Sequence, residues 1–565
     1  MITVNKINSF IKHNIFNKVV NSKKKNYIRY SAFRKLMLEE RSNIYHENLE
    51  QGLLSIITSV WNTKPTYIDE LVESLLSQRG GTNFEWIILD NGSDNTETID
   101  YLKTLHQYPF VKLYRVEKNQ GIINGMRFLL EKATGKYIIP MDSDDVLYPD
   151  AIVIITAHIK QKKFPALLYS DEDKIEADGS YGWPYFKPDW DPVLFINSCY
   201  IAHVCVIDRL KALELEAYTD SNADGSHDWD TFVRFYNAGY VPEHIPEVIY
   251  SWRMHPQSTA MNSASKDYLE SSQLTVLNRF LSKKEFSERY FIDKSQFFPE
   301  HLNWWIRRKP IVTKKVLTVV FVGPNSPHRS SHFYSNHYPL HQVRTLLLDS
   351  QTIPALLRIA KEQEANNTLI HCIWECVGFP QQDWINDVLL NFELFPDTVM
   401  VGSRIMNTNG QVISAGSFFG FKDGCGCPDE FRPLYDRGYF GRLWKPHSVG
   451  SVSSQHVIFD TSFLIEFLQT CTDPVMSIYY LGEWAGAFAR RRQKRVVYTP
   501  HLTSIASDNW YKKVTLQEKH RFNKQNYDLF GEEILFSKHL NASGEVSYRP
   551  WTSVMRKSHL ESLKT

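Results

Sequence analysis

The sequence predicts an α/β fold, a mostly parallel β-sheet covered by helices, and it predicts this layer twice along the 565-residue chain. Short apolar runs alternate with amphipathic stretches from residue 53 to about residue 250. A second alternation of the same kind begins at residue 316. The apolar runs are continuous, which is typical of strands buried on both faces of a parallel sheet.

In the first half, we expect strands at "LLSIITSV" (53–60), "EWIILD" (85–90), "VKLYRV" (111–116) and "KYIIPMD" (136–142). Helices are expected at residues 67–77, 121–133 and 149–160. A helix after each strand returns the chain to the same edge of the sheet, so this order favours parallel pairing.

A charged stretch at residues 283–314 predicts a domain boundary. The strands expected beyond it are "VLTVVFVG" (316–323), "NTLIHCIW" (367–374), "DTVMVGSRI" (397–405) and "KRVVYTP" (494–500). The predicted organisation is an N-terminal segment (1–50), a first α/β domain (51–300), a second α/β domain (315–510) and a helical basic tail (511–565).

A faint internal repeat links the two α/β domains. "YIIPMDSDDVLYPDAI" and "LIHCIWECVGFPQQDWI" share a strand, a turn, a proline and a helix start. "HDWDTFVRFYNAGYVPEHIP" and "GEWAGAFARRRQKRVVYTP" share a helix followed by a strand that ends in proline. The repeat indicates a duplicated domain, and only its first copy is rich in carboxylates.

Composition excludes several classes of protein. Aromatic residues make up 13% of the chain, which excludes full disorder. Lys and Arg (64) balance Asp and Glu (63), so we expect no nucleic-acid partner. No run of 18 apolar residues occurs, which argues against a synthase with its own membrane channel.

The seven cysteines are too few for a disulfide framework, and their spacing does not match the pairs of a zinc site. The N-terminus lacks the uninterrupted apolar run of a signal peptide. These features predict a cytoplasmic protein with reduced cysteines.

Residues 1–35 hold nine Lys and Arg and no acid, and their apolar residues recur at helical spacing. A basic amphipathic helix suits an anionic membrane surface, so we expect a peripheral protein on the inner face of the plasma membrane. The alternative is a helix that packs on the protein's own body and exposes its basic face to solvent.

The clearest concentration of reactive residues is Asp142-Ser143-Asp144-Asp145, directly after "YIIPM". Ligands of α/β proteins bind at the carboxyl ends of parallel strands. Two carboxylates at i and i+2 can share one divalent cation, whose other ligands are diphosphate oxygens and water. The alternative is a turn in which Asp145 caps the next helix.

Two further acidic motifs fit the same site. "DNGSD" (90–94) follows "EWIIL", where a carboxylate can accept a hydrogen bond from a base or ribose, although "DNG" is also a common tight turn. "HDWD" (227–230) begins a helix, where Asp228 is either a helix cap or a general base aimed into the site.

Seven motifs occur in the following order along the first half of the chain: "SIITSVWN", "LDNGSDN", "MDSDDVLYPDAI", "YSDEDKIEADG", "YFKPDWDP", "HDWDTFVRFYNAGY" and "HIPEVIYSWRMHPQSTA". Together they resemble glycosyltransferase family 2, especially its bacterial O-antigen and capsule polysaccharide transferases of the rhamnosyltransferase type. The resemblance covers about residues 52–262. It implies that residues 51–300 form a catalytic GT-A domain, which binds a nucleotide-sugar.

Position by position, the resemblance implies a donor site at three strand ends. Val60 and Asn62 are expected beside the nucleotide, and Asp90 is expected to contact its base. Asp142 and Asp144 match the DxD motif that holds a metal ion and the diphosphate.

The resemblance also implies that Asp228 is the catalytic base. Arg253 and His255 match a late Arg-x-His element, which makes Arg253 a donor-binding residue and His255 a metal ligand. His227 departs from the family, which usually has Glu or Gln before the base.

Glu172, Asp173 and Lys187 match segments near the sugar and the acceptor. The implied function is inverting, Mn²⁺- or Mg²⁺-dependent transfer from a UDP-, dTDP- or GDP-sugar to a glycan or lipid-linked acceptor. The product is expected to be a cell-surface polysaccharide, either O-antigen or capsule.

The second domain is predicted to be a degenerate GT-A-like domain without nucleotide-sugar chemistry. Aligning Pro149 with Pro380 leaves Glu375 as its only carboxylate opposite the DxD motif, and Glu483 falls opposite Asp228. Two alternatives remain open, a bifunctional transferase with two active domains and a non-catalytic glycan-binding or scaffold protein. A sugar nucleotidyltransferase is disfavoured, because "TSVWNTKPTY" is not a glycine-rich phosphate loop.

Overall fold

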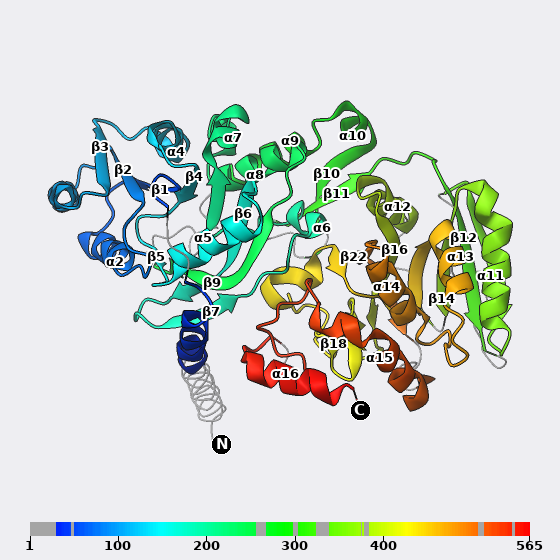
Figure 1. The fold of residues 1–565 in the computed structure, drawn as a ribbon. Helices are drawn as coiled ribbons and strands as arrows, with labels where there is room; N and C mark the ends of the chain where they lie inside the picture. The colour runs from blue at the N-terminus through cyan, green and yellow to red at the C-terminus, as the bar shows by residue number, and fades with distance from the viewer. Residues whose placement is uncertain are drawn as a thin grey trace, which may run out of the picture. The chain divides into compact units, whose positions relative to one another are not determined.

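A computed structural model describes residues 30–46, 50–255, 267–295, 297, 303–323, 338–374, 376–377, 383–506, 513–544 and 548–564. These residues form two compact units (Figure 1). The chain passes from the first unit to the second after Phe280, and the second unit also takes the segment Asp191–Tyr200 from within the first part of the chain. The boundary predicted from the sequence is at residues 283–314.

The first unit is built on a nine-stranded sheet in the order β3-β2-β1-β4-β8-β6-β9-β5, with β7 paired to β6. Its strands are β1 (Leu54–Val60), β2 (Glu85–Asn91), β3 (Val111–Val116), β4 (Tyr137–Pro140), β5 (Val146–Leu147), β6 (Leu167–Ile175), β7 (Tyr181–Tyr185), β8 (Cys205–Asp208) and β9 (Glu243–Arg253). Strands β3, β2, β1 and β4 are mutually parallel, as predicted. The sheet is nevertheless mixed, because β8 enters between β4 and β6 antiparallel to both.

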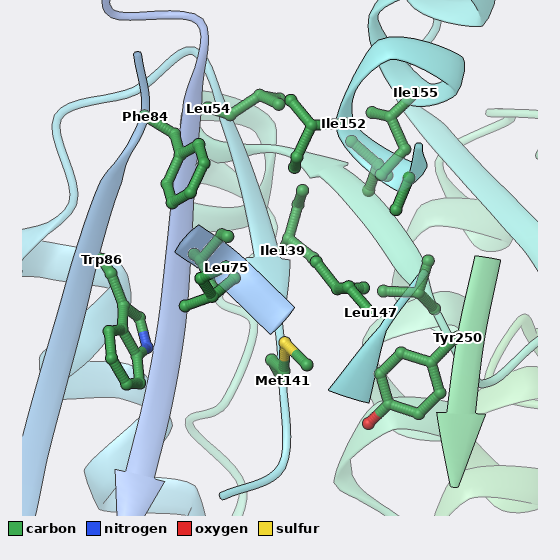
Figure 2. Close-up of a cluster of buried hydrophobic side chains, with 14 of the residues drawn as sticks. Leu54, Leu75, Phe84, Trp86, Ile139, Met141, Leu147, Ile152, Ile155 and Tyr250 are labelled. Atoms are coloured by element: carbon green, nitrogen blue, oxygen red, sulfur yellow. The ribbon is translucent and has the colours of Figure 1, made fainter. Parts of the chain in front are cut away.

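Helices cover both faces of this sheet. They are α2 (Pro65–Leu76), α3 (Thr96–Thr104), α4 (Gly121–Lys132), α5 (Ala151–Gln161), α7 (Arg209–Glu214), α8 (His227–Asn237) and α9 (Asp267–Phe280). Leu54, Trp86 and Ile139 point toward α2 and α5, where they meet Leu75 and Ile152 (Figure 2). Side chains alternate along a strand, so the other face of β1 and β2 is left for α4, which packs there.

Residues 30–42 form a helix that packs on the first unit. Tyr30, Phe33, Met37 and Arg41 are buried along one face of it. Arg41 donates to both carboxylate oxygens of Asp150, at 3.0 and 2.8 Å. This part of the basic segment thus binds the protein's own body, and residues 1–29, on which the membrane prediction mainly rests, lie outside the described residues.

The second unit is built on a sheet with the order β13-β12-β14-β21-β16-β22-β15, with β17 paired to β16 and β20 to β22. Its strands are β12 (Lys315–Val322), β13 (His341–Leu347), β14 (Thr368–Trp374), β15 (Cys376–Val377), β16 (Thr398–Met406), β17 (Val412–Ser414), β20 (His447–Val449), β21 (His456–Asp460) and β22 (Arg495–Ala506). This order repeats β2-β1-β4-β8-β6-β9-β5 of the first unit, and every corresponding pair runs in the same relative direction. The duplication inferred from the faint repeat is therefore present in the topology.

The remaining elements of the second unit surround this sheet. They are α6 (Pro192–Phe195), α10 (Lys284–Arg289), β10 (Tyr290–Lys294), β11 (Trp304–Arg308), α11 (Thr352–Gln363), α12 (Trp384–Leu394), α13 (Thr461–Thr470), β18 (Phe418–Phe421), β19 (Gly424–Gly426), α14 (Leu481–Arg491), α15 (Leu516–Gly531) and α16 (Ser553–Ser562). Phe522 and Trp551 of the predicted tail are buried, so the described tail residues form part of this unit. Within the described ranges, no helix combines the length and apolarity needed to span a bilayer.

We predict that Arg41→Leu lowers the free energy of unfolding by about 3–5 kcal/mol, because it leaves the buried carboxylates of Asp150 and Glu247 without their cation. Urea unfolding followed by circular dichroism measures the change. Lys35→Ala is the control, since Lys35 forms only an exposed ion pair with Glu39 and should cost at most about 1 kcal/mol. Equal stability of the two variants would contradict the prediction.

Candidate active site

The acidic turn follows β4 at the carboxyl end of the parallel strands. Its last residue, Asp145, is buried and accepts hydrogen bonds from the Tyr250 hydroxyl (2.5 Å) and the Arg253 backbone N–H (2.7 Å). Asp145 therefore links the turn to β9. The alternative, in which Asp145 caps the next helix, is wrong, since the N-cap position of α5 is Asp150. The side chains of Asp142 and Asp144 remain accessible to solvent.

The end of β9 brings two further predicted residues to this turn. His255 Nε2 lies 2.8 Å from Asp144 Oδ2. Arg253 Nε donates to the Asp144 carbonyl (2.7 Å), and its Nη2 donates to Glu70 of α2 (2.5 Å). His255 thus meets an acidic side chain of the turn, whereas the Arg253 guanidinium is held by protein groups.

Asp228 lies in the first turn of α8 and belongs to the same site. Its side chain is 26% exposed, and its Oδ1 lies 3.7 Å from Nε2 of His227. Desolvation by the surrounding protein raises the pKa of Asp142, and so do the nearby carboxylates of Asp144 and Asp228. His203 lowers this pKa. The fold thus brings three carboxylates, from the β4 turn and from α8, close enough to interact electrostatically.

His203, which sequence reasoning missed, is a neighbour of Asp142 that lowers the pKa of this carboxyl group. Glu172 Oε2 accepts from the His203 backbone N–H (2.6 Å), and Lys187 Nζ donates to the His203 carbonyl (2.7 Å). Lys187 and Glu172 are buried and lie 3.2 Å apart. These two predicted sugar or acceptor residues therefore hold the backbone beside the site.

Asp173 is also buried, and its carboxylate is hydrogen-bonded to other protein side chains. Its Oδ2 accepts from the hydroxyls of Tyr30 (2.8 Å) and Tyr148 (2.5 Å). Burial raises its pKa to about 6, although the hydrogen bonds from the two tyrosines lower it. Its contacts tie the helix at residues 30–42 to β6.

The three residues predicted to bind the nucleotide lie at the ends of β1 and β2, where Val60 and Asp90 are paired in register. Val60 is buried, so its backbone is the part that a nucleotide could meet. Asn62 adopts a left-handed backbone conformation and binds the loop after β2. Its Nδ2 donates to Asp94 Oδ1 (2.7 Å), and its Oδ1 accepts from the Asp94 backbone N–H (3.0 Å). Asp90 accepts from the Ser93 N–H (3.0 Å) and forms an ion pair with Arg115.

The donor set of the acidic turn suits a divalent cation. Asp142 and Asp144 offer carboxylate oxygens whose negative charges act on one another, and His255 contacts one of them. Among the residues that the structure describes, no three His, Cys, Asp or Glu side chains converge on one point as a closed metal cage. A cation that takes most of its ligands from diphosphate and water needs only one or two carboxylates from the protein.

Residues 55–200 match the family described as "Glycosyl transferase family 2". Together with the sheet and the acidic turn, this match indicates the class of protein. The matched region of the first unit is similar to the glycosyltransferases of family 2.

Three relatives share this region. An uncharacterized protein, y4gI, of Sinorhizobium fredii is 31% identical over 42% of this chain and 26% of its own length. The O-antigen biosynthesis protein RfbC of Myxococcus xanthus is 23% identical over 41% of this chain and 18% of its own. A chondroitin synthase of Pasteurella multocida is 26% identical over 45% of this chain and 25% of its own. The matched region thus spans about a quarter or less of each relative.

We predict that Asp173→Asn changes how stability depends on pH. The folded-state pKa of about 6 exceeds the unfolded value of about 4. The stability that Asp173 contributes is therefore fully present below about pH 4 and is lost as the pH rises through 6. Relative to the wild type, Asp173→Asn should gain stability over this interval, as measured by urea unfolding at several pH values.

The control for this experiment is Asp178→Asn. Hydrogen bonds from Ser180 lower the pKa of Asp178, so this variant should lose stability relative to the wild type as the pH rises through that low pKa, and should gain none between 4 and 6. A flat difference between Asp173→Asn and the wild type would show that Asp173 titrates normally.

Proposed function

We propose that the first unit is an inverting glycosyltransferase that moves a sugar from a nucleotide-sugar to a glycan acceptor in cell-surface polysaccharide synthesis. The observation that carries the proposal is the gathering of Asp142, Asp144 and Asp228 in one site, close enough for their charges to act on one another. The similarity to an O-antigen biosynthesis protein and to a chondroitin synthase supports the class of product.

In this proposal, Asp228 takes the proton of an acceptor hydroxyl as its oxygen attacks the anomeric carbon. The new bond joins that oxygen to the sugar, and the bond between the anomeric carbon and the diphosphate breaks, with its electron pair leaving on the nucleoside diphosphate. Attack opposite the leaving group inverts the configuration. Asp228 suits the role because its side chain is partly exposed and lies beside the imidazole of His227.

Other carboxylates near the site are less suited to act as the base. Asp230 is buried between Arg234 (2.7 Å) and Arg279. Glu172 is buried against Lys187. These ion pairs occupy both buried carboxylates, so neither is open to an acceptor hydroxyl.

On the donor side, we propose that the ends of β1 and β2 bind the nucleoside through Val60, Asn62 and Asp90. Asp142, Asp144 and His255 would hold Mn²⁺ or Mg²⁺, which when bound offsets the negative charge of the leaving diphosphate. Arg253 is proposed to position Asp144, because it holds the carbonyl of that residue and is itself held by Glu70.

We propose that the second unit does not transfer sugar. Residues 141–145 separate β4 from β5, whereas a single residue, 375, separates the corresponding strands β14 and β15. Ile373 and Trp374, aligned by sequence with the DxD motif, are buried within β14. Glu375 itself lies outside the described residues.

The defining experiment is to incubate the purified chain with UDP-, dTDP- and GDP-sugars and Mn²⁺, and to measure nucleoside diphosphate release with and without glycan acceptors. Release from one donor class that increases with an acceptor supports the proposal. No release from any donor, with the protein folded, would contradict it.

We predict that Asp228→Asn lowers turnover about 10²–10⁴-fold and changes the donor KM only a few-fold, because the amide cannot take up a proton but keeps the shape of the side chain. Steady-state release of nucleoside diphosphate measures both constants. Asp224→Asn is the matched control, an exposed aspartate on the segment before α8, and should retain full turnover. Near-normal turnover of Asp228→Asn would place the base elsewhere.

We predict that EDTA abolishes turnover, that Mn²⁺ restores it, and that Asp144→Ala cannot be restored at the same Mn²⁺ concentration. The physical reason is the loss of a carboxylate ligand from a site that offers few protein ligands. Full turnover in EDTA would remove the metal from the mechanism.

A further inference from the structure

The second unit contains a cavity of about 700 Å³ that the proposed transfer reaction does not use. Its lining includes Cys425 of β19, Glu483 of α14, Tyr480, Lys519 of α15 and His559 of α16. Its size falls in the range of pockets that bind small molecules.

Glu483 corresponds to Asp228 of the first unit, because α14 precedes β22 as α8 precedes β9 and a tryptophan follows both residues. Their environments differ. The Glu483 side chain is only 5% exposed, and its Oε2 is buried with no hydrogen-bond partner among the residues that the structure describes. Burial raises the pKa of Glu483 to about 8, so the group is mostly a neutral acid at pH 7.

A neutral carboxyl group both donates and accepts a hydrogen bond. A buried polar atom without a partner costs free energy. A ligand hydroxyl in the cavity would supply the missing partner. Glu483 is therefore suited to bind a hydroxyl group and poorly suited to act as a base.

The charges that line the cavity cancel in pairs. Lys519 Nζ lies 2.6 Å from Asp423, and Lys422 forms an ion pair with Glu430. The lining also carries serine hydroxyls and the ring of Tyr480, which packs edge-on against Phe522. A nucleoside diphosphate would find no net positive charge here, whereas a sugar matches the hydroxyl groups and the aromatic ring.

We propose that this cavity binds a neutral carbohydrate, a short segment of glycan, with Glu483 hydrogen-bonded to one of its hydroxyl groups. The second unit is then a glycan-binding domain built on the duplicated fold. Binding at this cavity requires no nucleotide-sugar, so it does not depend on the transfer proposed for the first unit.

The test measures binding of the full chain to an array of neutral oligosaccharide fragments from bacterial O-antigens and capsules, without donor or metal. Glu483→Gln should retain binding within a few-fold, because an amide also donates and accepts. Glu483→Leu should weaken it at least tenfold. Since leucine removes an unpartnered buried polar group, thermal unfolding of this variant should show a retained or raised midpoint.

Ser543→Trp provides a second variant that fills the cavity without changing Glu483, and it should also abolish binding. Ser553→Trp, on the exposed start of α16 and outside the cavity lining, is its matched control. Asp142→Ala in the first unit should leave glycan binding unchanged, which separates this site from the proposed transfer site.

Three results would overturn the proposal. The first is absence of binding to any glycan of the array. The second is equal binding by the wild type, Glu483→Leu and Ser543→Trp. The third is binding of UDP or a UDP-sugar that Glu483→Leu abolishes, which would make the cavity a nucleotide site.

Discussion

The active site depends on one buried carboxylate, Asp145. Its two hydrogen bonds join the turn after β4 to the end of β9, a strand that begins about a hundred residues later. Burial and the carboxylates of Asp144 and Asp142 raise the pKa of Asp145 well above its usual value, while its bonds to Tyr250 and Arg253 lower it. This link orients the turn so that Asp142 and Asp144 face solvent and so that His255 reaches Asp144.

The same fold occurs twice in this chain with different local chemistry. The two sheets share their order and strand directions, because apolar strands and covering helices satisfy the same packing rules in both units. The acidic turn lies outside that framework: in the second unit the aligned residues Ile373 and Trp374 belong to strand β14, and the order of the sheet is kept. The sheet and its helices set the fold of each unit, whereas the side chains on the loops set its chemistry.

Corresponding carboxylates also take different roles through their surroundings. Asp228 stays partly exposed beside His227, whereas Glu483 is buried in a region where the lining charges are already paired. Desolvation disfavours the charged form of Glu483, so this carboxyl group suits a hydrogen bond to a hydroxyl better than the role of base that we propose for Asp228. A duplicated transferase domain could in this way become a carbohydrate-binding domain.

The sequence by itself determined the α/β layers, the approximate strands and helices, and the motifs at the strand ends, because hydrophobic periodicity and turn residues are local properties. It did not determine that β8 enters the first sheet antiparallel or that Asp145 binds β9. It also could not show that Glu172 and Lys187 hold His203 or that Glu483 lines a cavity. Those facts depend on partners far apart in the chain and on burial, which only the tertiary structure decides.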